Sequence, residues 1–238
     1  MHSSAAAARS TTLSTTEVLV AIDGAESTDA RLQVAADALH GQFGFDRVII
    51  SLRDASLNPI SGGVAGGPES ATGISLPQTP LPGAVWRRRL PHLDRFRVGD
   101  LYFLDGSDGW VSREFFGSEP TADRQDDQWL ATDLIVGVLR GARQEILGFV
   151  KLAGARDGQR PDAARLREIE TVVRHLSARV AFDALQALAE QRHERLQLLQ
   201  EAGTSLTRSL DEQEIMRELA HRLEDTNEKL RAATRAAA

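Results

Sequence analysis

The feature that most constrains this chain is a change in composition at Pro161. Residues 162–238 contain no proline and a single glycine, Gly203, whereas residues 25–160 are dense in both. Proline and glycine are the residues that a helix interior tolerates least. The change therefore predicts a mixed domain followed by helix. Arg160-Pro161-Asp162 is expected to begin that helix, because proline lacks the N–H that the first turn leaves unused.

Apolar residues near the start of the predicted helix recur at alternating spacings of three and four. This spacing is typical of a helix that packs in a narrow seam against a partner helix. We therefore expect residues 161–203 to form a signalling helix that pairs with a second copy, in a parallel or an antiparallel sense. The predicted dimer seam consists of Leu166, Ile169, Val173, Leu176 and Val180.

The regular spacing slips near residues 181–185, and Gly203 is expected to weaken the helix. Asp211, followed three residues later by Glu214, resembles a capping box that starts a fresh helix. Residues 204–238 are accordingly predicted to be a second helical segment. We expect it to lead to an output unit that is missing from this chain or supplied by a partner.

The region before Pro161 alternates between helical and strand patterns. One amphipathic helix is predicted over 28–43, a short helix over 82–89, and a second short helix or a turn over 107–116. Residues 66–82 read as a long loop, and residues 1–24 as a disordered leader. The predicted strands cover 47–54, 60–65, 100–104, 133–140 and 146–153, which makes residues 25–160 an α+β domain with segregated helices.

Several segments of the chain resemble GAF domains of bacterial sensory proteins. They are QFGFDRVIISL at 42–52, GAVWRRR at 83–89 followed by RVGDLY at 97–102, GSDGWV at 106–111 with EFFG at 114–117, and ILGFVKL at 146–152 followed by DGQRP at 157–161. The resemblance covers residues 25–190. It implies an antiparallel sheet with the terminal helices on one face and a loop-roofed pocket on the other.

The resemblance also implies a role in sensing small molecules within two-component or cyclic-nucleotide signalling, as a dimer joined through its terminal helices. It does not fix the ligand. Aromatic residues gather in the middle of the domain, which fits either a ligand pocket or a small core under a long loop. The predicted pocket residues are Trp86, Arg89, His92, Tyr102, Trp110, Phe115 and Trp129.

Arginines at 87, 88, 89, 95 and 97 form the only basic concentration in a chain of net charge −6. Two interpretations remain open: these arginines bind an anionic ligand, or they only form the hydrated surface of a short helix. Nucleic acid is disfavoured as a partner because the patch is short and the chain acidic. The aspartates at 123, 126, 127 and 133 are interpreted as a solvated loop, with Asp133 at the edge of a strand, rather than as a catalytic pair.

No catalytic or metal-binding motif is found, so the chain is not expected to be an enzyme, and no cofactor is identified. The six histidines lack the spacing of metal ligands. The absence of cysteine excludes thiol nucleophiles and any cysteine-linked chromophore. It also argues against a GAF-like methionine sulfoxide reductase, whose chemistry needs thiolates.

No apolar run approaches the ~20 residues that span a bilayer, and no secretory signal precedes the domain, so a cytoplasmic location is expected. The sequence thus predicts a regulatory module that senses a small molecule or a partner and signals through paired helices. A downstream kinase, cyclase or phosphatase would supply the output. The alternative is a dimerisation scaffold that binds no ligand.

Overall fold

The computed structural model describes residues 14–67, 81–120, 125 and 127–236, without the side chains of 206, 207, 209, 210 and 230–236. The chain divides into two units, Met1–Ala184 and Leu185–Ala238. Most of the predicted loop over 66–82, and residues 1–13 of the predicted leader, lie outside the described residues. The first unit holds the sheet and the second is helical.

A six-stranded antiparallel sheet forms the centre of the first unit, in the order β2-β1-β6-β5-β4-β3. The hairpin predicted at the end of the domain is confirmed, with β5 next to β6. The sheet and its flanking helices confirm the α+β prediction. The strands are β1 (Phe45–Arg53), β2 (Pro59–Ala65), β3 (Arg97–Val98), β4 (Leu101–Leu104), β5 (Leu134–Arg140) and β6 (Ile146–Ala155).

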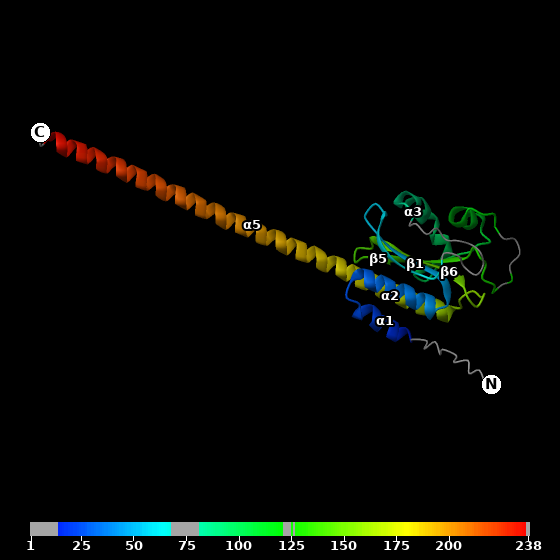
Figure 1. Ribbon diagram of the computed structural model, residues 1–238. Coiled ribbons are helices and arrows are strands. Elements are labelled where there is room, and N and C mark those ends of the chain that lie inside the picture. The colour runs from blue at the N-terminus through cyan, green and yellow to red at the C-terminus, as the bar shows by residue number, and fades with distance from the viewer. Residues whose placement is uncertain (1–13, 68–80, 121–124, 126, 237–238) are drawn as a thin grey trace, which may run out of the picture. The chain divides into compact units, whose positions relative to one another are not determined.

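Helices from both ends of the domain cover one face of the sheet (Figure 1). They are α1 (Thr15–Gly24), α2 (Thr28–Gly41) and the beginning of α5 (Ala163–Ala236). Alternate residues of the central strands, such as Val48, Ile50 and Leu152, face these helices and form the larger core. Every second residue of a strand points to the same side of the sheet, so these residues form one apolar face against the helices.

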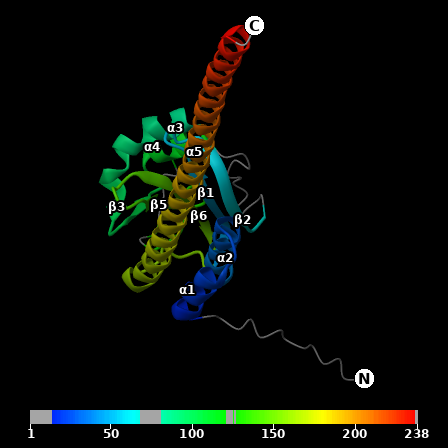
Figure 2. The same cartoon turned by 90° about the vertical axis from the view of Figure 1, so that its left-hand side faces the viewer.

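Short helices lie on the opposite face, as Figure 2 shows for α3 and α4. The remaining set of alternate strand residues, including Leu134, Val136 and Phe149, forms a second core beneath them. The helical elements of this layer are α3 (Gly83–Arg89), η1 (Leu90–His92), η2 (Asp94–Phe96), α4 (Gly109–Val111) and η3 (Ser112–Phe116).

The helix α1 corrects the prediction of a disordered leader for residues 15–24, within the part of that leader that the structure describes. Ser14 and Glu17 form a reciprocal capping box that satisfies backbone N–H groups at the start of this helix. Val18 and Ile22, four residues apart, are fully buried in the larger core. The leader prediction overlooked the cap, which turns a short apolar stretch into one face of a helix.

The predicted dimer seam is used by the domain itself, which corrects that assignment. Ile169 and Leu176 are fully buried in the larger core, Val173 and Val180 are at most 5% exposed, and Leu166 packs at the edge. The helix lies so close to β5 that a Cβ on Gly137 would sit 2.9 Å from Val173 Cγ1. Pairing through these residues would require the domain to release its own helix.

The second unit contains the remaining part of α5, which is helical as far as Ala236. The predicted break at Gly203 and fresh start at Asp211 are wrong, because the helix runs through both positions. No helix in the described part of the chain is long and apolar enough to cross a membrane. Large apolar side chains are exposed along this unit, among them Leu185, Leu188, Leu196, Leu198, Leu199, Ile215, Met216, Leu219 and Leu223.

Candidate functional site

Four basic side chains are buried on the sheet face that carries the short helices. Arg47 and Arg53 come from β1, and Lys151 comes from the neighbouring strand β6, where it pairs with Ile49. Arg89 ends α3 above them. These four side chains are 3–8% exposed. Charged groups are almost never buried to this extent unless they are paired, so the cluster calls for an explanation.

Each of the three arginines donates a hydrogen bond to at least one backbone carbonyl oxygen. Arg47 Nη1 donates to Gly66 O at 2.6 Å, and Arg53 Nη1 donates to Leu57 O at 3.0 Å and to Leu81 O at 2.5 Å. Arg89 Nη2 donates to the carbonyl of Glu114. These bonds tie the chain around the sheet face to the strands beneath, and they account for only part of the donors of each guanidinium.

Several donors in the cluster have no acceptor among the described residues. They are Arg47 Nε, Arg53 Nη2, Arg89 Nη1 and the indole Nε1 of Trp86, all of which are buried. A buried polar group without a hydrogen bond costs about 1–3 kcal/mol. Four such groups therefore lie on this one sheet face, where Arg47, Arg53, Arg89 and Trp86 gather.

Lys151 lies at the centre of this basic cluster. Burial, together with the smaller effect of the neighbouring positive charges of Arg53, Arg89 and Arg47, lowers the pKa of Lys151 to about 8. Neither a hydrogen bond nor an ion pair to Lys151 Nζ is found within the described ranges. Its amine therefore alternates between the charged and the neutral form near neutral pH, and a nearby anion would favour the charged form.

Two carboxylates offset part of this positive charge. Glu114 accepts from Arg88 at 2.9 Å and from Arg89 Nε at 3.5 Å, and its pKa is lowered by these arginines. Asp54 acts on Arg53 through its negative charge, which raises the pKa of Arg53 against the larger lowering effect of burial. With Arg88 included, five cations face these two carboxylates, so the site has a net positive charge when Lys151 is protonated.

Aromatic rings pack beside the basic cluster. The rings of Trp86 and Phe149 stack with their centroids 3.7 Å apart, and Trp86 is fully buried. The guanidinium carbon of Arg89 lies 4.1 Å from the centre of the Phe115 ring. Stacking on an aromatic face stabilises a cation that has lost its water, so these rings help to keep Arg89 buried.

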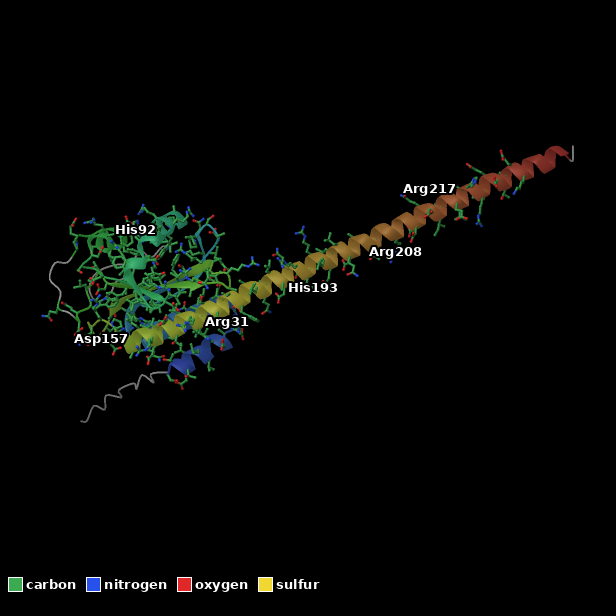
Figure 3. The ribbon with its side chains drawn as sticks, turned by 180° about the vertical axis from the view of Figure 1, so that it is seen from behind. Arg31, His92, Asp157, His193, Arg208 and Arg217 are labelled. Atoms are coloured by element: carbon green, nitrogen blue, oxygen red, sulfur yellow. The ribbon has the colours of Figure 1, made fainter. Side chains whose placement is uncertain are left out.

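The structure brings together five of the seven predicted pocket residues, including Trp110, which packs against the second core with its ring centroid 5.7 Å from that of Phe115. Trp86, Tyr102 and Phe115 belong to the second core, and Arg89 lies beside them. His92 is exposed and its ring lies 5.3 Å from the half-buried ring of Trp110, at the margin of this group. Figure 3 shows His92 on the side of the domain opposite to Arg31 of α2.

Trp129 is a correction to the predicted pocket. It packs between Phe45 and Phe103 on the helix-covered face, with ring centroids 5.9 and 5.8 Å away. The aromatic residues of the middle segment therefore serve both faces of the sheet. Sequence order alone could not separate them, because Phe115 and Trp129 precede the same strand, β5, and yet lie on opposite faces of the sheet.

The sequence analysis missed Arg47, Arg53 and Lys151. Their signal was present, because each stands within a strongly apolar strand at the period of two that defines one face. In β1 the pattern is Arg47, Ile49, Ser51 and Arg53, and all four are buried. A charged residue at an inward-facing strand position is informative because burial of a charge is costly.

Two other features of the domain carry less chemistry. A cleft of about 750 Å³ is lined by residues of β3 and of the start of α5. In this cleft Arg160 forms an ion pair with Asp105 at 3.1 Å, and its guanidinium group lies over the Phe103 ring. Asp133, part of the predicted acidic loop, is fully buried and accepts from Gly106 N and Leu130 N. Asp123 and Asp126 lie outside the described residues, and no cluster of metal-binding side chains exists within the described set.

The arrangement defines an α+β domain built on one antiparallel sheet, with terminal helices on one face and short helices over a basic, aromatic patch on the other. No protein-family model matches the sequence, and no curated protein matches it. Among solved structures, it is similar to the phycocyanobilin-bound GAF domain from a cyanobacterial phytochrome. The two share 13% identity over 73% of this chain and 97% of that chain, with a TM-score of 0.50.

Two further solved structures are similar at lower TM-scores. A methyl-accepting chemotaxis protein shares 16% identity over 72% of this chain and 98% of that chain, with a TM-score of 0.45. The GAF domain from an Acinetobacter phosphoenolpyruvate-protein phosphotransferase shares 11% identity over 74% and 94%, with a TM-score of 0.43. The first unit of this chain has the GAF fold.

Proposed function

We propose that this chain is a regulatory module in which the GAF domain receives a small molecule or a partner and passes its state to a pair of helices. The observation that carries the proposal is the dual use of α5. Its first part supplies Ile169, Leu176 and Val180 to the core of the domain, and the same helix runs on to Ala236. A shift of the sheet would therefore act directly on the helix that leaves it.

The partner of residues 185–236 in this proposal is a second copy of the chain. Phe182, Leu185, Leu196 and Leu199 follow spacings of three, eleven and three, which keep them on one stripe of a heptad pattern. All four are more than half exposed. A helix that lacks tertiary packing is marginally stable in water, so pairing along this stripe would supply the missing stabilisation.

Salt bridges near the end of the domain support the transmission part of the proposal. Arg31 of α2 contacts Asp183 of α5 at 2.6 Å, and Asp23 of α1 contacts His175 and Arg179 of α5 at 3.0 and 3.2 Å. The two N-terminal helices, α1 and α2, thus both contact α5 just before residue 185. Rearrangement of these contacts offers two alternative packings of the helix, as a conformational switch requires.

The downstream partner and the location complete the proposal. Among the similar structures are a chemotaxis protein, a phytochrome domain and a domain of a phosphotransferase protein. We propose that a kinase, cyclase or phosphatase provides the output, that the module itself is not catalytic, and that it works in the cytoplasm. Covalent attachment of a bilin through cysteine is unavailable to this chain, which contains none.

A scaffold without a ligand is the second candidate function. The observation that favours it is the complete burial of Trp86 against Phe149, which fills part of the sheet face with the domain's own side chains. The two candidates share the helix pairing and differ in whether a molecule binds at the basic cluster. Binding of any small molecule with unit stoichiometry would favour the sensor.

Light scattering of the full chain tests the pairing. The double variant Leu196→Glu and Leu199→Glu places charge on the proposed stripe and is expected to halve the molecular mass. Leu198→Glu is the matched control, because Leu198 is 66% exposed, compared with 63% and 62% for the other two, and lies off the stripe. A monomeric parent protein, or an unchanged mass in the double variant, would refute this pairing.

A further inference from the structure

We infer that the ligand of the basic cluster is a small molecule carrying a dianionic oxyanion, either a phosphate or a pair of carboxylates. This inference rests on the proposed sensory function and names the chemistry of its ligand. The donors that would hold the anion are Lys151 Nζ, Arg53 Nη2 and Arg89 Nη1, with the Trp86 indole N–H beside them. The two arginine nitrogens and the Trp86 indole nitrogen are buried and have no acceptor among the described residues.

The type of donor selects the type of ligand. A guanidinium with a spare terminal nitrogen and an ammonium can only donate hydrogen bonds, so the missing partner must be an acceptor. Charged donors make their strongest bonds with carboxylate and phosphate oxygens. A neutral carbonyl compound would satisfy the geometry but would leave the positive charge uncompensated.

The charge balance favours a ligand with more than one negative charge. Arg47, Arg53, Arg89 and Lys151 contribute four buried positive charges, and the carboxylates that act on them are Asp54 and Glu114, which also pairs with the exposed Arg88. A dianion would offset the excess positive charge better than a monoanion would. The attachment of the arginines to the carbonyls of Leu57, Leu81 and Gly66 fixes them in place before an anion arrives and lowers the ordering cost of binding.

Lys151 provides the cleanest variant for a test. Its side chain has no hydrogen bond within the described residues, so Lys151→Met removes charge without removing a described structural contact. Arg53→Gln is the second variant, although it also loses the bonds to Leu57 and Leu81. Arg143→Gln is the matched control, because Arg143 is an exposed arginine in the turn between β5 and β6.

The experiment is calorimetric titration of the full chain with inorganic phosphate and, separately, with succinate, at constant ionic strength in chloride. We expect at least one of the two to bind the parent and the Arg143→Gln protein equally. Binding should weaken at least about tenfold in Lys151→Met and Arg53→Gln, the loss expected for a charge-assisted hydrogen bond. Phosphate binding alone identifies a phosphorylated ligand, and succinate binding alone a dicarboxylate.

A second readout separates a direct role of Lys151 from a general loss of stability. The pKa of this lysine is about 8, and a bound anion would favour its protonated form. Titration at pH 8 in two buffers of different ionisation heat should show proton uptake on binding by the parent and none by Lys151→Met.

The inference is overturned if neither anion binds, or if Lys151→Met binds as tightly as the parent protein. Either outcome is distinguishable from failure of the proposed function. A chain that pairs through residues 196 and 199 but ignores both anions would keep its helical pairing and lose only this ligand assignment.

Discussion

The side-chain hydroxyl of Ser177 forms hydrogen bonds with both the backbone N–H and the backbone carbonyl of Arg140. It accepts a hydrogen bond from Arg140 N at 2.7 Å and donates one to Arg140 O at 2.9 Å. Arg140 ends β5, where the pairing with β6 changes register. A single side chain of α5 thus replaces the hydrogen bonds that the irregular strand end lacks, and it joins helix and sheet at a fixed point.

Ser177→Ala should therefore destabilise the domain. The substitution leaves two backbone groups near the core without their partner, and such groups cost about 1–3 kcal/mol. Urea unfolding measures the change, and Ser205→Ala is the control because Ser205 is exposed in the second unit. Equal unfolding midpoints for the two variants would mean that the Ser177 contact contributes nothing.

Two glycines are expected to respond to alanine in opposite directions. In Gly137→Ala the new Cβ meets Val173 Cγ1 at 2.9 Å, and overpacking of this kind typically costs about 1–3 kcal/mol. In Gly203→Ala nothing lies within 4 Å of the new Cβ, and the helix gains up to about 1 kcal/mol. Thermal unfolding followed by circular dichroism checks both signs. Loss of helix in Gly203→Ala would contradict the continuous α5.

Charge introduced at Val173 and Leu176 distinguishes a core from a dimer seam. Both residues are buried against the sheet, so Val173→Glu with Leu176→Glu should unfold the domain, at a cost above about 4 kcal/mol. A seam would instead give folded monomers. Near-ultraviolet circular dichroism together with light scattering separates these outcomes, and the second would restore the original seam.

The strands and the larger helices were predictable because their patterns arise from local geometry. The predicted strand over 47–54 corresponds to Phe45–Arg53, and the predicted hairpin to Leu134–Arg140 and Ile146–Ala155. The stripe from Leu166 to Val180 was also found correctly, but its partner was not. An apolar stripe of the same spacing forms whether a helix packs on a sheet or on another helix, so periodicity cannot identify what it packs against.

The candidate site was only half predictable. Trp86 and Arg89 were found through their crowded segment, whereas Lys151 lies 62 residues beyond Arg89 and comes near it only in the folded domain. Trp129 was misplaced for the same reason, since the face a loop residue reaches depends on tertiary packing. Pairing of strands distant in sequence carries no local signal, and it decides which charges share a site.

The buried lysine predicts a pH dependence of stability in the absence of an added anion. Its pKa falls from an ordinary 10.5 to about 8 on folding, so below pH 8 the folded state bears the full cost of the buried charge. As pH rises from 8 to 10.5 the unfolded chain binds more protons than the folded one, and this cost disappears. The parent protein should therefore gain stability relative to Lys151→Met across this window.

The size of that effect follows from the shift. At about 1.4 kcal/mol per pKa unit, Lys151→Met should be more stable than the parent by up to about 3 kcal/mol at pH 7, and nearly equal to it at pH 10.5. Urea unfolding in chloride buffers at the two pH values measures the difference. If the parent were instead more stable than Lys151→Met at pH 7, the positive charge of Lys151 would have to be balanced by a partner in the folded state.

The most direct test of transmission uses the absence of cysteine from this chain. Gln197→Cys provides a single position for a spin label, and pulsed dipolar spectroscopy then measures the distance between labels on paired copies. We compare this protein with and without Gly137→Ala, which pushes on Val173 inside the domain, and with Gly41→Ala, whose Cβ meets nothing within 4 Å. We predict a defined distance that shifts or broadens with Gly137→Ala and stays unchanged with Gly41→Ala; identical distributions in all three proteins, or no dipolar coupling, would contradict transmission through α5.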